Sequence, residues 1–150
     1  MKKKDNKKYI YLLLLVLIMS IIFLFSSQSN DKSQTISNKV IEVTKQDVVT
    51  NVINENLDIN INPIILVRKG AHASLYFILA ITCFLTLKEF KVKNTETICI
   101  LLCLLYASSD EIHQIFIRGR TASILDVIID MLGATFGVLL IYTIKKNRIN

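Results

Sequence analysis

The sequence lacks most of the motifs by which soluble enzymes and nucleic-acid-binding proteins are recognised. It has no G-x-S-x-G nucleophile motif, so covalent catalysis has little support, and no glycine-rich phosphate loop, so phosphotransferase activity is discounted. The three cysteines, Cys83, Cys99 and Cys103, form no C-x-x-C pair and lie inside apolar runs. This placement indicates packing residues rather than disulfides or zinc ligands.

Basic residues are in excess, but they are not arranged for binding nucleic acid. The formal charge is +6 at pH 7. The lysines and arginines lie at the ends of apolar runs, and no basic stripe with interleaved aromatic residues is present. We therefore expect no nucleic-acid partner, and we expect the basic residues to anchor and orient helices in a lipid bilayer.

Long apolar runs are abundant. Hydrophobic residues make up 52% of the 150 residues, which is too many for a soluble domain of this size. A membrane-spanning helix needs about 20 mostly apolar residues, and four such runs occur, at 9–26, 64–87, 97–117 and 124–144. The pattern predicts one all-α domain over residues 1–150, an integral membrane four-helix bundle.

The first apolar run follows five lysines, as a secretory signal peptide would. Its apolar stretch is long, and no A-x-A cleavage site follows it, which favours a retained membrane anchor over a cleaved signal.

The positions of lysine and arginine predict the orientation. Five lie at the amino end, three in the 88–93 loop and three in the carboxyl tail, so eleven of the eighteen would be cytoplasmic and both ends of the chain would lie inside. The polar segment 27–63 would then lie on the outer side. Its apolar residues recur at roughly helical spacing, which favours amphipathic helices on the membrane surface over a disordered linker.

Ionisable and hydrogen-bonding side chains gather in the outer halves of the last three predicted spans. Such groups are costly in lipid and usually mark functional sites. Counting inward from the outer ends places His72, Asp110 and Asp130 at a similar depth, roughly 9 to 12 Å at about 1.5 Å per residue. The candidate site, for ligand binding or acid–base chemistry, consists of Arg68, Lys69, His72, Tyr76, Asp110, Glu111, His113, Gln114, Arg118, Arg120, Asp126 and Asp130.

Two interpretations of this candidate site remain open. The four cations among its residues would either serve a ligand site or pair with the four acids and only fix the helix register. The two histidines lack the H-x-x-x-H and H-E-x-x-H spacings that place ligands on one helix face. We therefore expect no metal and no cofactor, but a network in which His113 and Asp110 bond to the basic face of the second span.

Several of these residues fall in short motifs that occur together in one known family. The motifs are FSSQS at 25–29, RKGAH at 68–72 with Tyr76, SDEIHQ at 109–114, and RGR at 118–120 followed by Asp126, Asp130 and Gly133. In this combination and order the sequence resembles the VanZ-like family of bacterial membrane proteins. The resemblance implies a multi-pass protein of the bacterial cytoplasmic membrane. The family's namesake is associated with reduced susceptibility to the glycopeptide teicoplanin, but the resemblance implies no established reaction.

Two functions of different classes fit these observations. In the first, the outer polar pocket binds an amphiphile, such as a lipid-linked wall precursor or an acylated glycopeptide, with cations holding its phosphate. In the second, a membrane enzyme uses His72 or His113 as a general base on a lipid headgroup or wall precursor. Transport is disfavoured because the chain has no internal repeat, and the sequence does not indicate the oligomeric state.

The predicted orientation can be tested with single cysteines in intact cells. A cysteine placed at Asn54 should react with a membrane-impermeant maleimide, whereas a cysteine placed at Asn94 should react only after the membrane is opened. Labelling of the Asn94 position from outside, or protection of the Asn54 position, would contradict the orientation.

Overall fold

The computed structural model describes residues 5–44 and 62–147, and every regular element in these ranges is helical. The helices are α1 (Asp5–Ser26), α2 (Asn30–Thr44), α4 (Pro63–Glu89), α5 (Thr95–Gln114) and α6 (Ile124–Asn147). The prediction of an all-α protein is therefore confirmed for the described part of the chain. In the 27–63 segment, α2 confirms a helix over its first half, and residues 45–61 lie outside the described residues.

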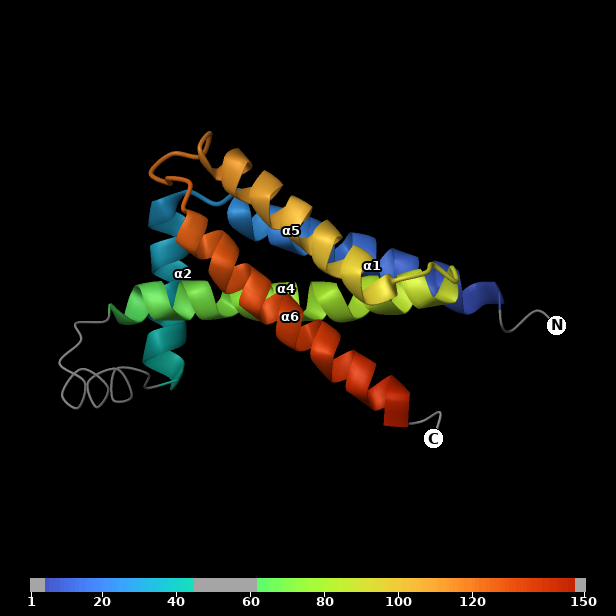
Figure 1. Cartoon of the computed structure of the whole chain (residues 1–150). Coiled ribbons are helices and arrows are strands. Elements are labelled where there is room, and N and C mark those ends of the chain that lie inside the picture. The colour runs from blue at the N-terminus through green and yellow to red at the C-terminus, as the bar shows by residue number, and fades with distance from the viewer. Residues whose placement is uncertain (1–4, 45–61, 148–150) are drawn as a thin grey trace.

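Helix α4 is the centre of the structure. It packs against α1, α2, α5 and α6; α2 crosses it near its amino end and α6 crosses it obliquely near its middle (Figure 1). The end of α1, the start of α4, the end of α5 and the start of α6 gather near α2, away from the amino and carboxyl ends of the chain. Segments that are distant in sequence but rich in polar residues are thereby brought to one end of the bundle.

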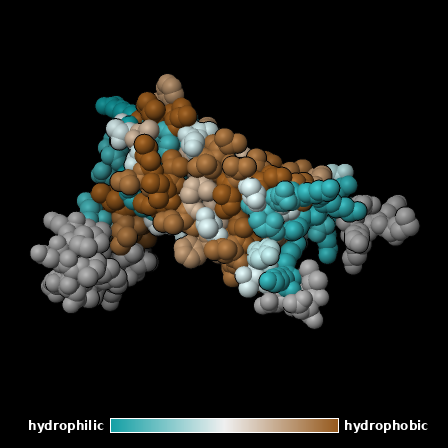
Figure 2. Space-filling model, in the orientation of Figure 1, coloured by the Kyte–Doolittle hydropathy of each residue, from teal (hydrophilic) through white to brown (hydrophobic). Residues whose placement is uncertain are grey.

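Three helices, α1, α4 and α6, are long and apolar enough to cross a membrane. Many of their large side chains face outward; Leu13 is 70% exposed and Phe136 is 66% exposed. Apolar residues cover the middle of the surface in Figure 2, with hydrophilic residues toward its ends. Surfaces of this kind are typical of contact with lipid rather than water.

Helix α5 differs from the other three because its carboxyl end carries several polar side chains. Asp110, Glu111, His113 and Gln114 occupy its last turns, which lowers its mean hydropathy. The predicted third span, 97–117, is also too long, because the α-helix ends at Gln114 and short turns follow. The sequence analysis missed this ending because Ile115, Phe116 and Ile117 continue the apolar run beyond the helix.

The interior of the bundle is built from large and small side chains of all four long helices. Tyr76, Phe84, Ile22, Cys99 and Cys103 are fully buried. All three cysteines are buried and unpaired by disulfides, as predicted for packing residues, and the Cys99 thiol donates to the carbonyl of Ala80 at 3.3 Å. These buried side chains hold α1, α4, α5 and α6 together in one core.

Two glycines allow α6 to approach α4 closely. A Cβ added at Gly137 would lie 2.5 Å from the carbonyl oxygen of Phe77, and one at Gly133 would be closer still to the carbonyl of Ala73. Gly133 and Gly137 thus form a G-x-x-x-G pair, in which small residues let helix backbones meet.

Replacing Gly133 with alanine should separate α4 from α6. The added methyl group meets backbone rather than a movable side chain, so a cost of about 1 to 3 kcal/mol is expected. Gly70→Ala is the matched control, because a Cβ there meets nothing within 4 Å and alanine favours helix. Thermal unfolding in detergent should show a lower midpoint for Gly133→Ala and an equal or higher one for Gly70→Ala; equal midpoints for the two variants would contradict the packing argument.

Candidate functional site

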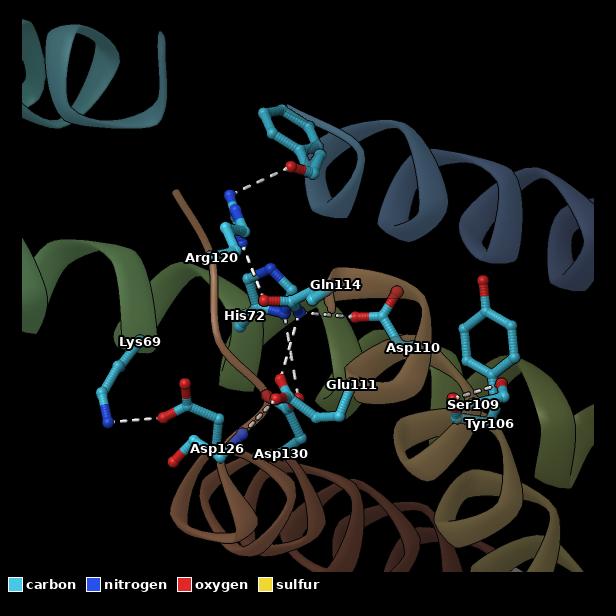
Figure 3. A network of polar contacts seen from close by, with 12 residues as sticks. Lys69, His72, Tyr106, Ser109, Asp110, Glu111, Gln114, Arg120, Asp126 and Asp130 are labelled. Carbon is cyan, nitrogen blue, oxygen red and sulfur yellow. Dashed lines mark hydrogen bonds and ion pairs between the residues drawn. The ribbon is translucent and has the colours of Figure 1, made fainter. Parts of the chain in front are cut away.

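A polar cavity lies where α2, α4, α5, α6 and the 115–123 loop meet. Its volume is about 260 Å³. Figure 3 shows side chains from α4, α5, α6 and the loop converging on this point. The lining residues are Asn30, Arg68, Lys69, His72, Glu111, Gln114, Gly119, Arg120, Thr121, Ser123, Asp126, Ile129 and Asp130. Eight of the twelve candidate residues are among them.

Two charged or chargeable pairs join α4 to α6. Lys69 forms an ion pair with Asp126, and His72 Nδ1 lies 3.8 Å from Asp130 Oδ2. The Lys69 and Asp126 side chains are about a quarter exposed, whereas Asp130 is buried. Because Asp126 and Asp130 are one helical turn apart, they meet Lys69 and His72, which are three residues apart on α4. The predicted convergence of these two spans is therefore present.

Glu111 joins α5 to the start of α6. One of its carboxylate oxygens accepts from the backbone N–H of Ser123 at 2.7 Å, and the other accepts from the Gln114 amide at 3.1 Å. The carbonyl of Ser123 accepts the first backbone bonds of α6. The carboxylate thus lies at the amino end of a helix, where the helix dipole favours negative charge.

Arg120 holds the 115–123 loop against two other elements. Its Nη1 donates to Gln114 Oε1 at 3.1 Å (Figure 3). Its Nε donates to the carbonyl of Gln28 at 3.0 Å, and its Nη2 lies 3.5 Å from the carbonyl of Phe25. All three acceptors are uncharged. The loop can turn here because Gly119 adopts a φ of +76°, a conformation that favours glycine.

Arg68 faces the same cavity from α4 and also has an uncharged partner. Its Nη1 donates to Asn30 Oδ1 at 3.0 Å. Burial and the nearby positive charge of Arg68 lower the pKa of Arg120, although a guanidinium stays charged in proteins. Among the described residues neither arginine forms an ion pair with a carboxylate, so the two positive charges are held together without direct neutralisation.

This arrangement departs from the one-to-one pairing of four cations with four acids. Of those four cations, only Lys69 forms such a pair within the described ranges. Arg118 is exposed and does not line the cavity, because the turn at Gly119 directs Arg120 inward and leaves the Arg118 carbonyl to accept from Asn30 N at 3.4 Å. Arg118 and Arg120 flank the same glycine, but only Arg120 lines the cavity.

Besides Arg118, the candidate residues Tyr76, Asp110 and His113 lie outside the cavity lining. Tyr76 and Asp110 are buried in the bundle. Tyr76 is fully buried in the core, with its ring 6.2 Å from that of Tyr106, and its hydroxyl has no hydrogen-bond partner among the described residues. Asp110 is buried and accepts from Gln114 at 3.2 Å. These two side chains are buried within the bundle and are not part of the cavity wall.

The prediction that His113 and Asp110 bond to the basic face of α4 is wrong. His113 Nε2 lies 3.2 Å from Ser27 Oγ, and its ring stacks on Phe23 at 4.7 Å. The α5 helix turns this side chain toward α1 because His113 is two residues from Glu111, which faces α6. Asp110 bonds to Gln114 on its own helix instead.

Sequence reasoning missed the contribution of the α1–α2 corner. Asn30 orients Arg68, and the carbonyls of Phe25 and Gln28 orient Arg120. Carbonyl groups carry no sequence signal, but the FSSQS motif at 25–29 marks the segment. The Ser123 N–H was missed for the same reason.

The comparisons with known proteins agree with this picture. A family model described as VanZ/LLP1 matches residues 11–145, which include the described helices except the first residues of α1 and the last residues of α6. The chain belongs to the VanZ/LLP1 family. No curated protein and no solved structure matches the chain. Together with the three apolar helices, the family match indicates a membrane protein.

The described part of this VanZ/LLP1 protein contains no group of three or more His, Cys, Asp or Glu residues that could hold a metal ion. His72 and His113 have different partners, Asp130 and Ser27. The expectation of a metal-free network stays a prediction.

Removing the Glu111 carboxylate should destabilise the connection from α5 to α6. Glu111→Ala removes the acceptor of the Ser123 N–H and one of the two acceptors of the Gln114 amide. We expect this loss to cost about 1 to 3 kcal/mol of folding free energy. Glu96→Ala on the same helix is the control, since its pair with Lys88 is exposed and such pairs contribute about 0 to 1 kcal/mol. Thermal unfolding in detergent measures both, and an equal loss in the two variants would contradict the role given to Glu111.

Proposed function

We propose that this VanZ/LLP1 protein crosses the bacterial cytoplasmic membrane four times, with both ends inside, and that its outer cavity binds the phosphate headgroup of an anionic amphiphile. A lipid-linked cell-wall precursor is the ligand class we favour. The lysine and arginine distribution supports the orientation, because it leaves the cavity on the outer side.

The packing of α5 supports counting it as a membrane span in addition to α1, α4 and α6. It contacts α1, α4 and α6, and its polar residues Asp110, Glu111 and Gln114 are buried in the bundle rather than turned toward lipid. Polar groups at membrane depth are tolerated when they face the interior and are paired. The low hydropathy of the end of α5 is therefore compatible with a membrane span.

The observation that carries the proposal is the unequal satisfaction of the charges around the cavity. Three acids line it, but Asp126 is paired with Lys69, Glu111 accepts two hydrogen bonds and Asp130 lies beside His72. Among the described residues, Glu111 and the two guanidinium groups have no oppositely charged partner within hydrogen-bond distance. Both oxygens of the Glu111 carboxylate accept hydrogen bonds, so the charges that remain open to a ligand are those of the two guanidinium groups. A phosphate bound between them would give each guanidinium a direct anionic partner.

Both arginines also keep hydrogen-bond donors for such a ligand. A guanidinium has five N–H donors; Arg120 uses three toward Gln114, Gln28 and Phe25, and Arg68 uses one toward Asn30. The neutral partners fix each side chain without cancelling its charge. Fixed arginine forks are well suited to phosphate oxygens.

Replacing Arg120 with glutamine should weaken binding of a phosphate-headed lipid. We expect the Kd for phosphatidic acid, measured by native mass spectrometry of the detergent-solubilised protein, to rise by about tenfold or more, as for loss of a charge-assisted hydrogen bond. Arg118→Gln is the matched control, because Arg118 lies two residues away and is exposed.

Arg68→Gln provides a second arm of that experiment, because Arg120 also ties the loop to α1. A thermal unfolding midpoint near that of the unmodified protein shows that a variant is folded. Unchanged phosphatidic acid binding in both folded variants would refute the proposal.

A second function, membrane catalysis, is favoured by the position of His72. It lines the cavity beside the buried Asp130, and a carboxylate in this position orients a histidine and stabilises its charged form, as required of a general base. The substrate would be the same lipid headgroup. Incubation of the protein with lipid extracts would test this: products formed by the unmodified protein but not by His72→Gln or Asp130→Asn would support catalysis, and their absence would exclude it for those lipids.

Lower susceptibility to teicoplanin-type lipoglycopeptides is the resistance role that fits such a pocket. A membrane site can select these drugs by their acyl tail. Equal inhibitory concentrations for acylated and non-acylated glycopeptides, with and without the gene, would remove this role.

A further inference from the structure

An apolar groove lies directly beside the polar cavity, between α2 and α4. Its volume is about 430 Å³. Along α4 it is lined by Val67, Ala71, Ser74 and Ile78, which recur at helical spacing on one face, and α2 contributes Ile36 and Val40. The small side chains of Ala71 and Ser74 leave space for the groove on this face of α4.

The groove and the polar cavity share part of their lining. Arg68, His72 and Arg120 border both. A molecule held by the two arginines can therefore continue into the groove without crossing a wall of protein. The two compartments differ sharply in chemistry, one being ionic and the other almost wholly apolar, as the two parts of a lipid are.

The groove has the length that a hydrocarbon chain needs. Val67 and Ile78 are eleven residues apart on α4, which corresponds to roughly 16 Å at about 1.5 Å per residue. One leaflet of a bilayer is about 15 Å deep, half of a hydrocarbon core of about 30 Å. A chain that starts at the arginines would run down α4 through the depth of its own leaflet.

The groove suits a hydrocarbon chain better than a peptide. The hydroxyl of Ser74 donates to the carbonyl of Gly70, and that of Ser37 donates to the carbonyl of Ser33. These two hydroxyl groups are thus satisfied within their own helices and present little to a ligand. A peptide would bring backbone N–H and C=O groups that need partners, whereas a hydrocarbon chain needs none.

We propose that one hydrocarbon chain of a phosphate-headed lipid lies in the groove between α2 and α4. This rests on the proposed headgroup site and deepens it, because it makes the ligand an intact membrane lipid rather than a free phosphate compound. Helix α2, which crosses α4, covers the chain on the side away from the bundle. The chain then selects among ligands that share a headgroup.

The test compares two phosphatidic acids that share a headgroup, one with six-carbon chains and one with oleoyl chains, by native mass spectrometry in one detergent. We expect the unmodified protein to bind the long-chain lipid about tenfold more tightly, because only the oleoyl chain is long enough to pack along the whole groove, and about 1.4 kcal/mol of added contact gives that factor. Ser74→Phe and Ala71→Phe fill the groove and should abolish this preference while retaining short-chain binding. Thr135→Phe, which adds the same ring to an exposed position of α6, should behave like the unmodified protein.

The outcomes separate this inference from the proposed headgroup site. Two outcomes would overturn the groove inference alone. In one, both groove variants keep the full preference for the long-chain lipid. In the other, the unmodified protein shows no chain preference, although Arg120→Gln still weakens binding of both lipids. Failure of the unmodified protein to bind either lipid would overturn the headgroup site, and the groove inference with it. A long-chain oleoyl lipid with a photoreactive group in its chain should crosslink to the 67–78 segment of α4 or to α2; crosslinks confined to other helices would also overturn the inference.

Discussion

The close contact between α4 and α6 is the constraint on which the rest of the structure depends. Gly133 and Gly137 bring α6 onto the backbone carbonyls of Ala73 and Phe77, and this contact fixes the rotation of α6 about its own axis. Asp130 and Asp126 lie on the same face, about one and two turns from Gly133 toward the start of the helix. The two carboxylates therefore face Lys69 and His72. The same helix contact that involves the glycines thus also positions the α4 and α6 side of the polar cavity.

The other half of the cavity depends on how the chain passes from α5 to α6. Helix α5 ends at Gln114, and the loop returns to α6 through a turn at Gly119. Glu111 receives the start of α6, and Arg120 reaches back to the α1–α2 corner. Each of these contacts uses a charged group with a neutral partner, which leaves the arginine charges available to a ligand.

A pocket of this kind resolves a problem that lipid ligands pose in a membrane. The chain of a lipid gains little by moving from the bilayer into an apolar groove, because both surroundings are apolar. Specific recognition must therefore come chiefly from the headgroup, and the preformed pair of guanidinium groups offers it. In the proposed arrangement, the groove places the headgroup beside the arginines and limits which chains fit.

The sequence alone determined the apolar helices, the polar clusters near the ends of three apolar runs, and the family. These follow from composition, run length and short motifs, because the cost of burying charge in lipid restricts where ionisable residues can occur. The Gly133 and Gly137 contact was also predictable, since helical phase relates the glycines to Asp126 and Asp130. The end of α5 was not, because Ile115 and Phe116 look like more of the same span.

Only the tertiary structure decided which candidate residues meet. Arg118 and Arg120 are indistinguishable in sequence, but the positive φ of Gly119 sends one outward and the other into the cavity. His113 faces α1, and Asn30, an uncharged residue outside the polar clusters of the last three apolar runs, joins the site from the α1–α2 corner. These choices depend on how separate helices rotate and pack against one another, which the periodicity within any one helix does not specify.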